Sequence, residues 1–379
     1  MSAPVESPRV ALYSRRAAER RVWHASQYEF EDLIAEIDSV GMVIPDVRRL
    51  SPVGRIVHGG VNRMRRAASL PRKAPLRPLK GAFDAEIFFG MFAAPHEVTA
   101  LPYLRDVLDR ARTKVAFIVE MYMPDLPKQA DHIRQLQGFD HIFVFTRDVI
   151  PHIEDITGVP TSFLPTGVDA LMFAPPRDAP TRFIDVMSYG RRILATHDAL
   201  VGATARGDLH YFYDTVHGPF DVQDHWQHRL ALAQSLHRSR HTIIHRNNDA
   251  ESRVQRTGGE ETLSNRLFEA ATAGTVILGS APQTPDFERY FDWPDALIQV
   301  PTPNARVVDL VRELAQEPER LARASRSGTV AGLRGFDWAY RWKEVLDVVG
   351  IDALPAYHDR VRRLQQRAAE FVVSETPRS

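Results

Sequence analysis

Short apolar runs alternate with amphipathic segments along the first half of the chain. Apolar and β-branched clusters predict strands at residues 9–14, 85–91, 114–122, 141–146 and 161–165. Apolar residues at helical spacing predict helices at residues 25–40, 101–111, 127–137 and 148–157. A strand followed by a helix, repeated several times, is typical of a parallel sheet covered on both faces.

A second series of the same kind follows the proline-rich residues 174–182. Strands are predicted at residues 183–188, 208–213, 241–246, 275–280 and 296–300. Helices are predicted from residue 197 and at residues 223–239, 263–273 and 285–291, with two or three more closing the chain. Residues 247–260, rich in Asn, Arg and Gly, are predicted to form a loop.

The fold predicted from these two series is α/β, with two Rossmann-like, doubly wound domains that face each other across a cleft. The expected boundaries are a first domain at residues 1–170, a hinge at 171–182 and a second domain at 183–350. Residues 351–379 are expected to form a helix and tail that pack back on the first domain. Ligands of open parallel sheets bind at the carboxyl ends of the strands, so a nucleotide site is expected there.

Composition narrows the chemistry. The 379 residues include no cysteine, which excludes disulfides, thiolate metal sites and a cysteine nucleophile. We find no cluster of metal-ligating residues at usable spacing. The start of the chain lacks the features of a signal peptide and no run is long and apolar enough for a membrane helix, so a cytoplasmic protein is expected. The net charge is zero, which argues against a nucleic-acid partner.

The charge is unevenly distributed, however. Residues 48–80 contain ten Arg or Lys and no acidic residue. Val57, Val61, Met64 and Ala68 fall on one helical face with arginines between them, which favours a helix that lies on an anionic acceptor or a membrane surface. Gly59 and Gly60 weaken such a helix, and a solvated loop is the alternative.

Residues 260–280 carry the most informative pattern. Glu261 and Glu269 are eight positions apart, about 80° past two full helical turns. We therefore expect both carboxylates near one side of a helix, with Glu261 at its entrance, although such spacing alone is common among surface glutamates. The entrance also offers the backbone N–H groups of Thr262, Leu263, Ser264 and Asn265. These donors and the helix dipole suit a phosphate, and a carboxylate two turns inside suits the hydroxyls of a ribose.

This stretch resembles the Glu-x7-Glu signature of retaining glycosyltransferases with the GT-B fold. SNRLFEA is similar to a common variant of that motif in which a lysine stands in place of Arg266. TGVDALMFAP (166–175) resembles the interdomain hinge of the family, with Thr166 replacing the usual Asn, and GFDWAYRWKEVL (335–346) resembles its C-terminal helix. The order and spacing agree, and the resemblance covers about residues 80–350.

The resemblance implies roles for residues of the second domain. Glu269 would bind the donor ribose, Glu261 would contact hydroxyls of the transferred sugar, and the amides of residues 262–265 would meet the diphosphate. The family also places an arginine and a lysine on the diphosphate after the first strand of this domain. In SYGRRILATHD, Arg191 follows Gly190 and fits the arginine, but no lysine is present. The candidate substitutes for that lysine are Arg192 and His197.

The first domain departs from the family in one further place. Many members have a histidine after the strand that corresponds to KVAFIV, and here Glu120 stands at that position. A carboxylate there is a candidate base for the acceptor hydroxyl.

The function implied is transfer of a sugar from a nucleotide-diphospho-sugar to an acceptor, with retention and without a metal ion or cofactor. Fixed cations and helix N–H groups would stabilise the departing diphosphate. The acceptor is a polysaccharide, a lipid or a small molecule, and the Arg- and Ala-rich composition suggests a bacterial enzyme. Two alternatives remain: a sugar-nucleotide epimerase of the same fold, and an inactive scaffold, which the missing lysine and Glu120 favour.

Overall fold

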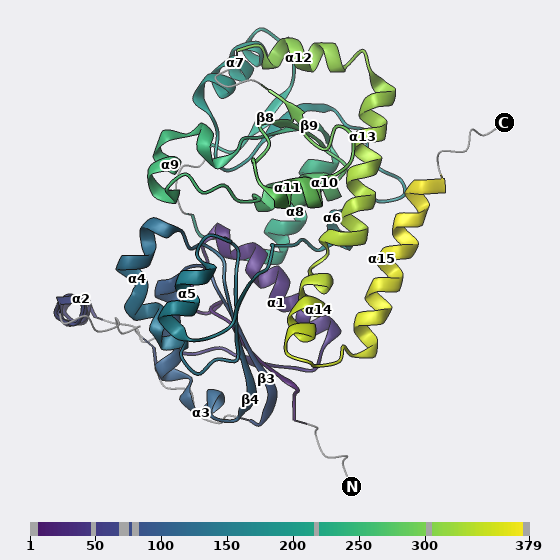
Figure 1. Ribbon diagram of the computed structural model, residues 1–379. Helices are drawn as coiled ribbons and strands as arrows, with labels where there is room; N and C mark the ends of the chain where they lie inside the picture. Colours follow the sequence, from purple (N-terminus) through teal and green to yellow (C-terminus); the bar gives the residue numbers. More distant parts are fainter. Residues whose placement is uncertain are drawn as a thin grey trace. The chain divides into compact units, whose positions relative to one another are not determined.

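The computed structural model describes residues 7–46, 51–67, 76–77, 83–215, 220–300 and 305–373. The chain separates into two compact units (Figure 1). The first comprises residues Met1–Pro165 and Trp342–Tyr357, and the second comprises Thr166–Arg341 and His358–Ser379. Each unit is built around one parallel β-sheet, which confirms the predicted fold of two parallel-sheet α/β domains.

The sheet of the first unit has six strands in the order β2-β1-β3-β4-β5-β6, and all of its pairs are parallel. The strands are β1 (Val10–Tyr13), β2 (Val40–Val43), β3 (Ala85–Phe92), β4 (Ala111–Ile118), β5 (His141–Val144) and β6 (Thr161–Phe163). The helices are α1 (Ala25–Ile37), α2 (Pro52–Ala67), α3 (Arg105–Leu108), α4 (Leu126–Ile133) and α5 (Ile150–Thr157). Phe88, Phe92 and Ile118 are fully buried in its core.

The sheet of the second unit has the order β11-β10-β9-β7-β8, again with parallel pairs. Its strands are β7 (Ile184–Ser188), β8 (Tyr211–Tyr213), β9 (Ser239–Ile244), β10 (Val276–Gly279) and β11 (Ile298–Gln299). Its helices include α6 (Ala170–Phe173), α7 (Leu194–Ala205), α8 (His225–His237), α9 (Glu251–Thr257), α10 (Asn265–Thr272), α11 (Pro285–Tyr290), α12 (Val307–Leu314) and α13 (Pro318–Ala331). Helix α14 (Trp338–Val348) crosses the boundary between the units, and α15 (Pro355–Val373) follows it.

Both sheets have the same topology. In each, the first strand lies between the second and the third, and the remaining strands follow in chain order. The strand order therefore reverses between β1 and β3 in the first unit and between β7 and β9 in the second. Open α/β sheets bind ligands in the crevice that this reversal leaves at the carboxyl ends of the strands. The topology thus selects one position in each unit for a functional site.

The C-terminal residues are divided between the units by specific contacts. Trp342 packs edge-on against Phe89 of β3 with ring centroids 5.3 Å apart, and its indole N–H donates to Asp38 at 2.9 Å. In α15, Arg360 donates to both oxygens of the fully buried Asp337, at 2.9 and 2.8 Å. Residues 342–357 consequently belong to the first unit, and most of α15 belongs to the second.

Three segments differ from their predicted form. Residues 101–111 were predicted as one helix. In the structure, a 3-10 helix at Pro95–Tyr103 is followed by the single α-helical turn α3. Pro102 lacks a backbone N–H, so it cannot continue an α-helical hydrogen-bond pattern. The predicted loop 247–260 contains α9. The edge strand β2 was not predicted at all, and only Val43 among its residues is fully buried.

Candidate functional site

The reversal point of the second sheet is formed by the loop after β7 and the loop after β9. Gly190 follows β7 and has a left-handed backbone, with φ of 69°, which glycine adopts without the cost that a side chain adds. Its N–H donates to a carboxylate oxygen of Asp214 at 2.8 Å. Gly279 ends β10, which lies beside β9. A Cβ on Gly279 would lie 1.8 Å from the carbonyl oxygen of Ile244 in β9. Glycine at position 279 therefore lets β9 and β10 end side by side.

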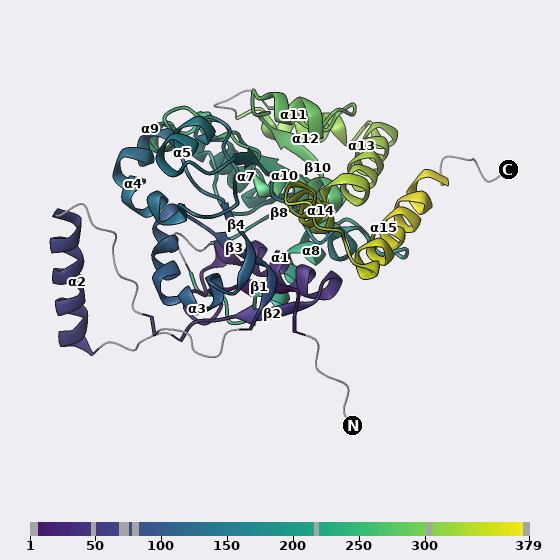
Figure 2. The same cartoon turned by 60° about the horizontal axis from the view of Figure 1, so that its bottom comes forward.

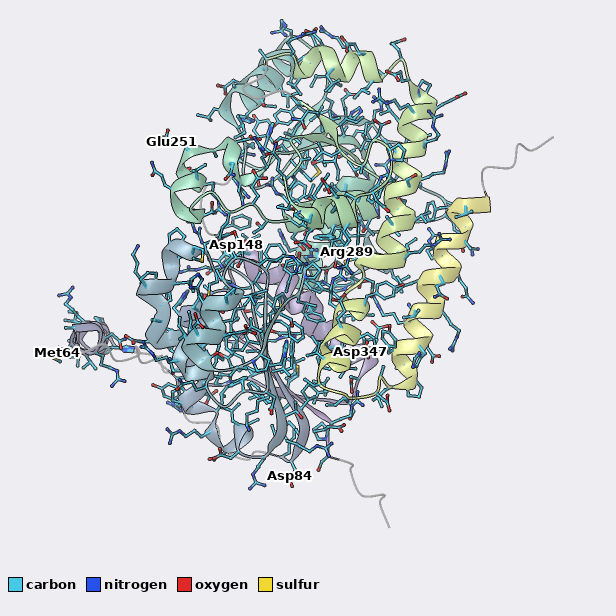
Figure 3. The ribbon with its side chains drawn as sticks, in the orientation of Figure 1. Met64, Asp84, Asp148, Glu251, Arg289 and Asp347 are labelled. Carbon is cyan, nitrogen blue, oxygen red and sulfur yellow. The ribbon has the colours of Figure 1, made fainter. Side chains whose placement is uncertain are left out.

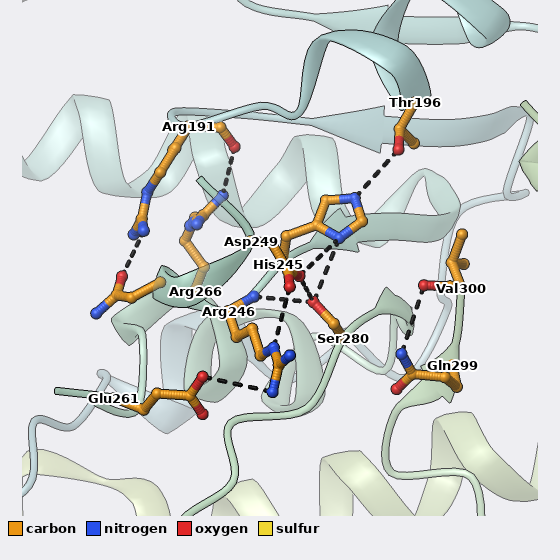
Figure 4. Close-up of polar contacts among 11 residues, drawn as sticks. Arg191, Thr196, His245, Arg246, Asp249, Glu261, Arg266, Ser280, Gln299 and Val300 are labelled. Atoms are coloured by element: carbon orange, nitrogen blue, oxygen red, sulfur yellow. Dashed lines mark hydrogen bonds and ion pairs between the residues drawn. The ribbon is translucent and has the colours of Figure 1, made fainter. Parts of the chain in front are cut away.

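Arg266, in the first turn of α10, holds the loop after β7 against this helix. Its Nη1 donates to the carbonyl oxygens of Tyr189 and Arg191, each at 3.1 Å, and its Nε donates to the hydroxyl of Ser264 at 3.2 Å. Figure 4 shows the contact from Arg266 to the Arg191 carbonyl. Burial lowers the pKa of this guanidinium below its ordinary value. The three acceptors are neutral oxygens, so a partly buried positive charge lies where the Gly190 loop meets the start of α10.

Arg191 extends the same basic surface toward the loop after β9. Its guanidinium donates to the side-chain oxygen of Asn247, and the amide nitrogen of Asn247 donates to the hydroxyl of Thr262 at 3.2 Å. Asn247 therefore joins the loop after β7 to the segment that precedes α10. Arg191, Asn247 and Thr262 come from three separate stretches of sequence, and the sheet topology brings them together.

Glu269 is buried in the second turn of α10. One carboxylate oxygen accepts from the guanidinium of Arg229 and, at 2.6 Å, from the amide of Asn265. The other oxygen accepts from the hydroxyl of Tyr189 at 2.9 Å. Burial and the neighbouring carboxylate raise the pKa of Tyr189 well above its ordinary value, so this hydroxyl keeps its proton. Glu269 thus anchors α8, α10 and the loop after β7 to one another.

Glu261 lies ahead of α10, and further from its first residue than predicted. Helix α10 begins at Asn265 with Ser264 as its N-cap, so Glu261 belongs to the preceding loop and the helical-angle argument does not apply to it. Its carboxylate accepts from the backbone N–H of Gln283 and lies 3.5 Å from Nη1 of Arg246. The side chain remains only 8% exposed. Contacts with two other loops therefore fix its position.

The four predicted phosphate-binding residues lie at the start of α10. Thr262, Leu263 and Ser264 precede α10, and Asn265 is its first residue. Leu263 is buried. The hydroxyl oxygen of Ser264 accepts a hydrogen bond from Arg266, and this side chain does not cap the helix. The helix therefore starts without a capping side chain beside the basic loop, a position that suits an anion.

A network of hydrogen-bonded polar side chains holds Arg246 in position. Nε of Arg246 donates to Asp249 at 3.0 Å, and Asp249 accepts from the hydroxyl of Ser280. His245 lies 3.4 Å from that hydroxyl and 3.3 Å from the hydroxyl of Thr196 (Figure 4). Burial lowers the pKa of His245, which favours its neutral form. These contacts run from α7 across the ends of β9 and β10 to Glu261.

The two residues expected to replace the missing lysine are engaged elsewhere. Arg192 forms an ion pair with Asp214 and also donates to the Asp214 carbonyl. The ring of His197 lies at hydrogen-bond distance, 3.0 Å, from the hydroxyl of Tyr211 and packs edge-on against Tyr213. The structure instead places Arg266 beside Arg191, with its guanidinium on the carbonyl oxygen of that residue.

Several members of this cluster were missed by sequence reasoning. Among them are Tyr189, Arg229, His245, Arg246, Asp249 and Ser280. Three of these have a signal in the sequence, because Tyr189 directly follows a predicted strand and Arg246 and Ser280 each end one, where parallel sheets carry their sites. Arg229 has none, since it lies within a predicted helix of ordinary polar character.

The equivalent position of the first unit is also charged. The loop after β1 carries Arg15, whose Nε lies 3.7 Å from Glu97, and His24 contacts the same carboxylate at 3.1 Å. Glu97 also accepts from the backbone N–H of Ala93, directly after β3. Glu120 follows β4 at the same edge, is exposed, and donates its backbone N–H to Ala93 at 2.8 Å. Glu120 thus belongs to the first unit, and the other predicted site residues belong to the second.

A pH dependence follows from Glu31, beside this position. Its carboxylate is buried against Arg16 at 2.9 Å, and burial raises its pKa from 4.5 to about 7. The folded chain therefore binds this proton more tightly than the unfolded chain does. The contribution of Glu31 to the free energy of unfolding is present below pH 4.5 and should be lost as the pH rises to about 7, by an amount on the order of 3 kcal/mol.

Urea unfolding of the wild type and Glu31→Gln between pH 4.5 and pH 7 measures this contribution. The difference in free energy between the two proteins should change with pH across that window. A constant difference would show that folding does not raise the pKa of Glu31.

The described part of the chain offers no group of three His, Asp or Glu side chains placed to hold a metal ion. None of its helices combines the length and apolar character needed to cross a bilayer. Metal independence of the reaction and the location of the protein stay predictions.

Known proteins resemble the chain in the part that carries this site and in its fold. Residues 191–347 match the family described as glycosyl transferase-like. No curated protein matches the chain in sequence.

The similar solved structures extend over both units. Anabaena Alr3699/HepE, solved in complex with UDP, shares 7% identity over 90% of this chain and 99% of its own, with a TM-score of 0.52. An alpha-glucosyltransferase solved with UDP and a DNA 13-mer containing a HMU base shares 10% identity over 91% of this chain and 99% of its own, with a TM-score of 0.54. Identities this low show the fold alone. The chain therefore has the GT-B fold, and residues 191–347 within it match the glycosyl transferase-like family.

Proposed function

We propose that the chain transfers a glycosyl group from a nucleoside-diphosphate sugar to an acceptor hydroxyl, with retention and without a metal ion. The segment that matches the glycosyl transferase-like family contains Arg191, Glu261, Arg266 and Glu269. Alr3699/HepE was also solved in complex with UDP-glucose, which makes a uridine nucleotide the first candidate for the donor.

The observation that carries the proposal is the environment of Arg266. This partly buried guanidinium donates to carbonyl and hydroxyl oxygens and, among the described residues, has no carboxylate hydrogen-bonded to it. It lies beside the glycine loop after β7 and at the start of α10, at the reversal point of the sheet. A diphosphate at this point would gain a charge-assisted contact and helix N–H donors together.

The proposed chemistry needs stabilisation of the leaving group above all. As the bond from the sugar C1 to the diphosphate oxygen breaks, negative charge accumulates on the phosphates. Arg191 and Arg266 are already held by protein contacts, so they need little reorganisation as that charge develops. Glu261, fixed by Gln283 and Arg246, would orient hydroxyls of the sugar, and Glu120 would accept the proton of the acceptor hydroxyl.

A nucleotide screen tests the donor site. Thermal unfolding would be followed with UDP, GDP, ADP, TDP and CDP, in EDTA and in magnesium. A ligand at about a hundred times its Kd adds about 2.7 kcal/mol to the free energy of unfolding. We expect one nucleotide to stabilise the wild type equally in both buffers. Arg191→Ala should lower the affinity for that nucleotide more than about tenfold, and the stabilisation should fall accordingly.

The matched control for Arg191→Ala is Arg206→Ala, an exposed arginine at the far end of α7 that pairs with Asp208. This control should bind as the wild type does. The proposal would be contradicted by absence of stabilisation with every nucleotide, and its metal-free part by stabilisation that requires magnesium.

A further inference from the structure

Helix α2 presents an apolar face to solvent. Its side chains Val53, Ile56, Val57 and Met64 are 70%, 75%, 59% and 67% exposed, and Val61 is exposed as well. Figure 2 shows α2 as one continuous helix, and Figure 3 labels Met64 on it. Side chains of this kind are normally buried, so a contiguous stripe of them in water marks an interaction surface.

The stripe is confined to one side of the helix. At 100° per residue, the apolar side chains span an arc of about 140°, in the order Ile56, Val53, Met64, Val57 and Val61. Asn62 and His58 lie on the opposite side and contact each other at 3.3 Å. Arg63 and Arg65 lie at the two borders of the apolar arc. The helix is therefore amphipathic along its whole length.

The charge of this region has one sign. Residues 52–67 contain four arginines and no acidic residue, and residues 48–80 contain ten basic residues and no acidic one. Two copies of α2 packed face to face would bring these charges together, which disfavours a second copy as the occupant. A nucleic acid would neutralise the arginines but leave the apolar arc in water.

We propose that α2 docks in the plane of a membrane surface that contains anionic lipids. The apolar arc would enter the boundary between headgroups and acyl chains, and Arg63 and Arg65 at its borders would meet lipid phosphates. This mode of binding uses both the stripe and the charge. It depends on α2 alone and not on the proposed transferase activity.

Flotation of the full-length protein with vesicles tests the proposal. Vesicles of phosphatidylcholine alone would be compared with vesicles in which about a quarter of the lipid is phosphatidylglycerol. We expect binding to the anionic vesicles that weakens as salt is raised. Ile56→Ser with Val57→Ser should reduce the affinity at least about tenfold, and Arg63→Gln with Arg65→Gln about thirtyfold.

Val348→Ser with Val372→Ser is the matched control, because these valines are 47% and 45% exposed on other helices. It should bind as the wild type does, and unchanged circular dichroism would show that every variant is folded. The proposal is overturned if the wild type does not float with anionic vesicles, or if the Ile56 and Val57 variant floats equally well. It is also overturned if light scattering shows a dimer that this variant dissociates, or if an oligonucleotide binds with the same dependence on Arg63 and Arg65 while vesicles do not bind.

Discussion

Arg266→Met is expected to lower the affinity for the donor nucleotide by a factor on the order of a hundred. The substitution keeps the length and apolar stem of the side chain and removes the guanidinium. It takes away the partly buried charge at the start of α10 and the donors to the carbonyl oxygens of Tyr189 and Arg191. The loop that carries Gly190 and Arg191 would then lose its attachment to the helix as the phosphate contact is lost.

The chain offers a closely matched control in Arg182. This arginine is also partly buried, and desolvation lowers its pKa to about 10. It donates to the carbonyl oxygens of Leu236, Ser239 and Ala273, at the opposite, amino-terminal edge of the same sheet. Arg182→Met should destabilise the fold by about 1–3 kcal/mol and leave the nucleotide affinity of the folded protein unchanged.

Isothermal titration with the nucleotide found in the screen separates the two variants. Arg266→Lys, which restores the charge but cannot bridge two carbonyl oxygens in the same way, should recover part of the affinity. If Arg266→Met and Arg182→Met lower the affinity equally, Arg266 acts only through stability, and the diphosphate does not bind beside it.

The second large effect is on stability. Glu269→Leu is expected to lower the free energy of unfolding by about 3–5 kcal/mol, because it leaves the buried guanidinium of Arg229 without the carboxylate to which it donates. Denaturation by urea measures the loss. Arg229→Leu with Glu269→Leu should recover much of it, since replacing both members of a buried ion pair by apolar residues is often nearly neutral. A double variant as unstable as the single one would contradict this explanation.

This structural role changes how a ribose contact must be tested. Loss of activity in Glu269→Leu would reflect loss of folded protein, so Glu269→Gln, which keeps the shape, is the informative variant. If Glu269 accepts hydrogen bonds from the ribose, the wild type should prefer UDP over 2′,3′-dideoxy-UDP and Glu269→Gln should lose that preference. An unchanged preference would assign the ribose to other residues.

The sequence predicted the arrangement of the site better than its details. Alternating strands and helices predicted both parallel sheets, and the strand-end rule placed Gly190 and Arg191 where the topology reverses. The segment around Glu269 was correctly assigned to a helix. These features depend on hydrophobic periodicity and local spacing, which are legible in a single sequence.

The details missed by prediction depend on tertiary contacts. Ser264 was predicted to lie inside the helix, but its extended backbone starts α10 at Asn265, so Glu261 lies further from the helix than predicted. Helix α9 has one apolar residue, Val254, and so lacks a periodic signal. The ion pair between Glu269 and Arg229 could not be predicted, because nothing in the sequence of α8 distinguishes Arg229 from a surface arginine.

The most direct test of the account is a crystal structure of the protein with the nucleoside diphosphate that stabilises it, grown in EDTA. We predict that the phosphates lie at the loop after β7 and the start of α10, with an oxygen hydrogen-bonded to Arg191 and the ribose facing Glu269. A nucleotide bound at another edge of the second sheet, or at the reversal point of the first unit, would contradict it.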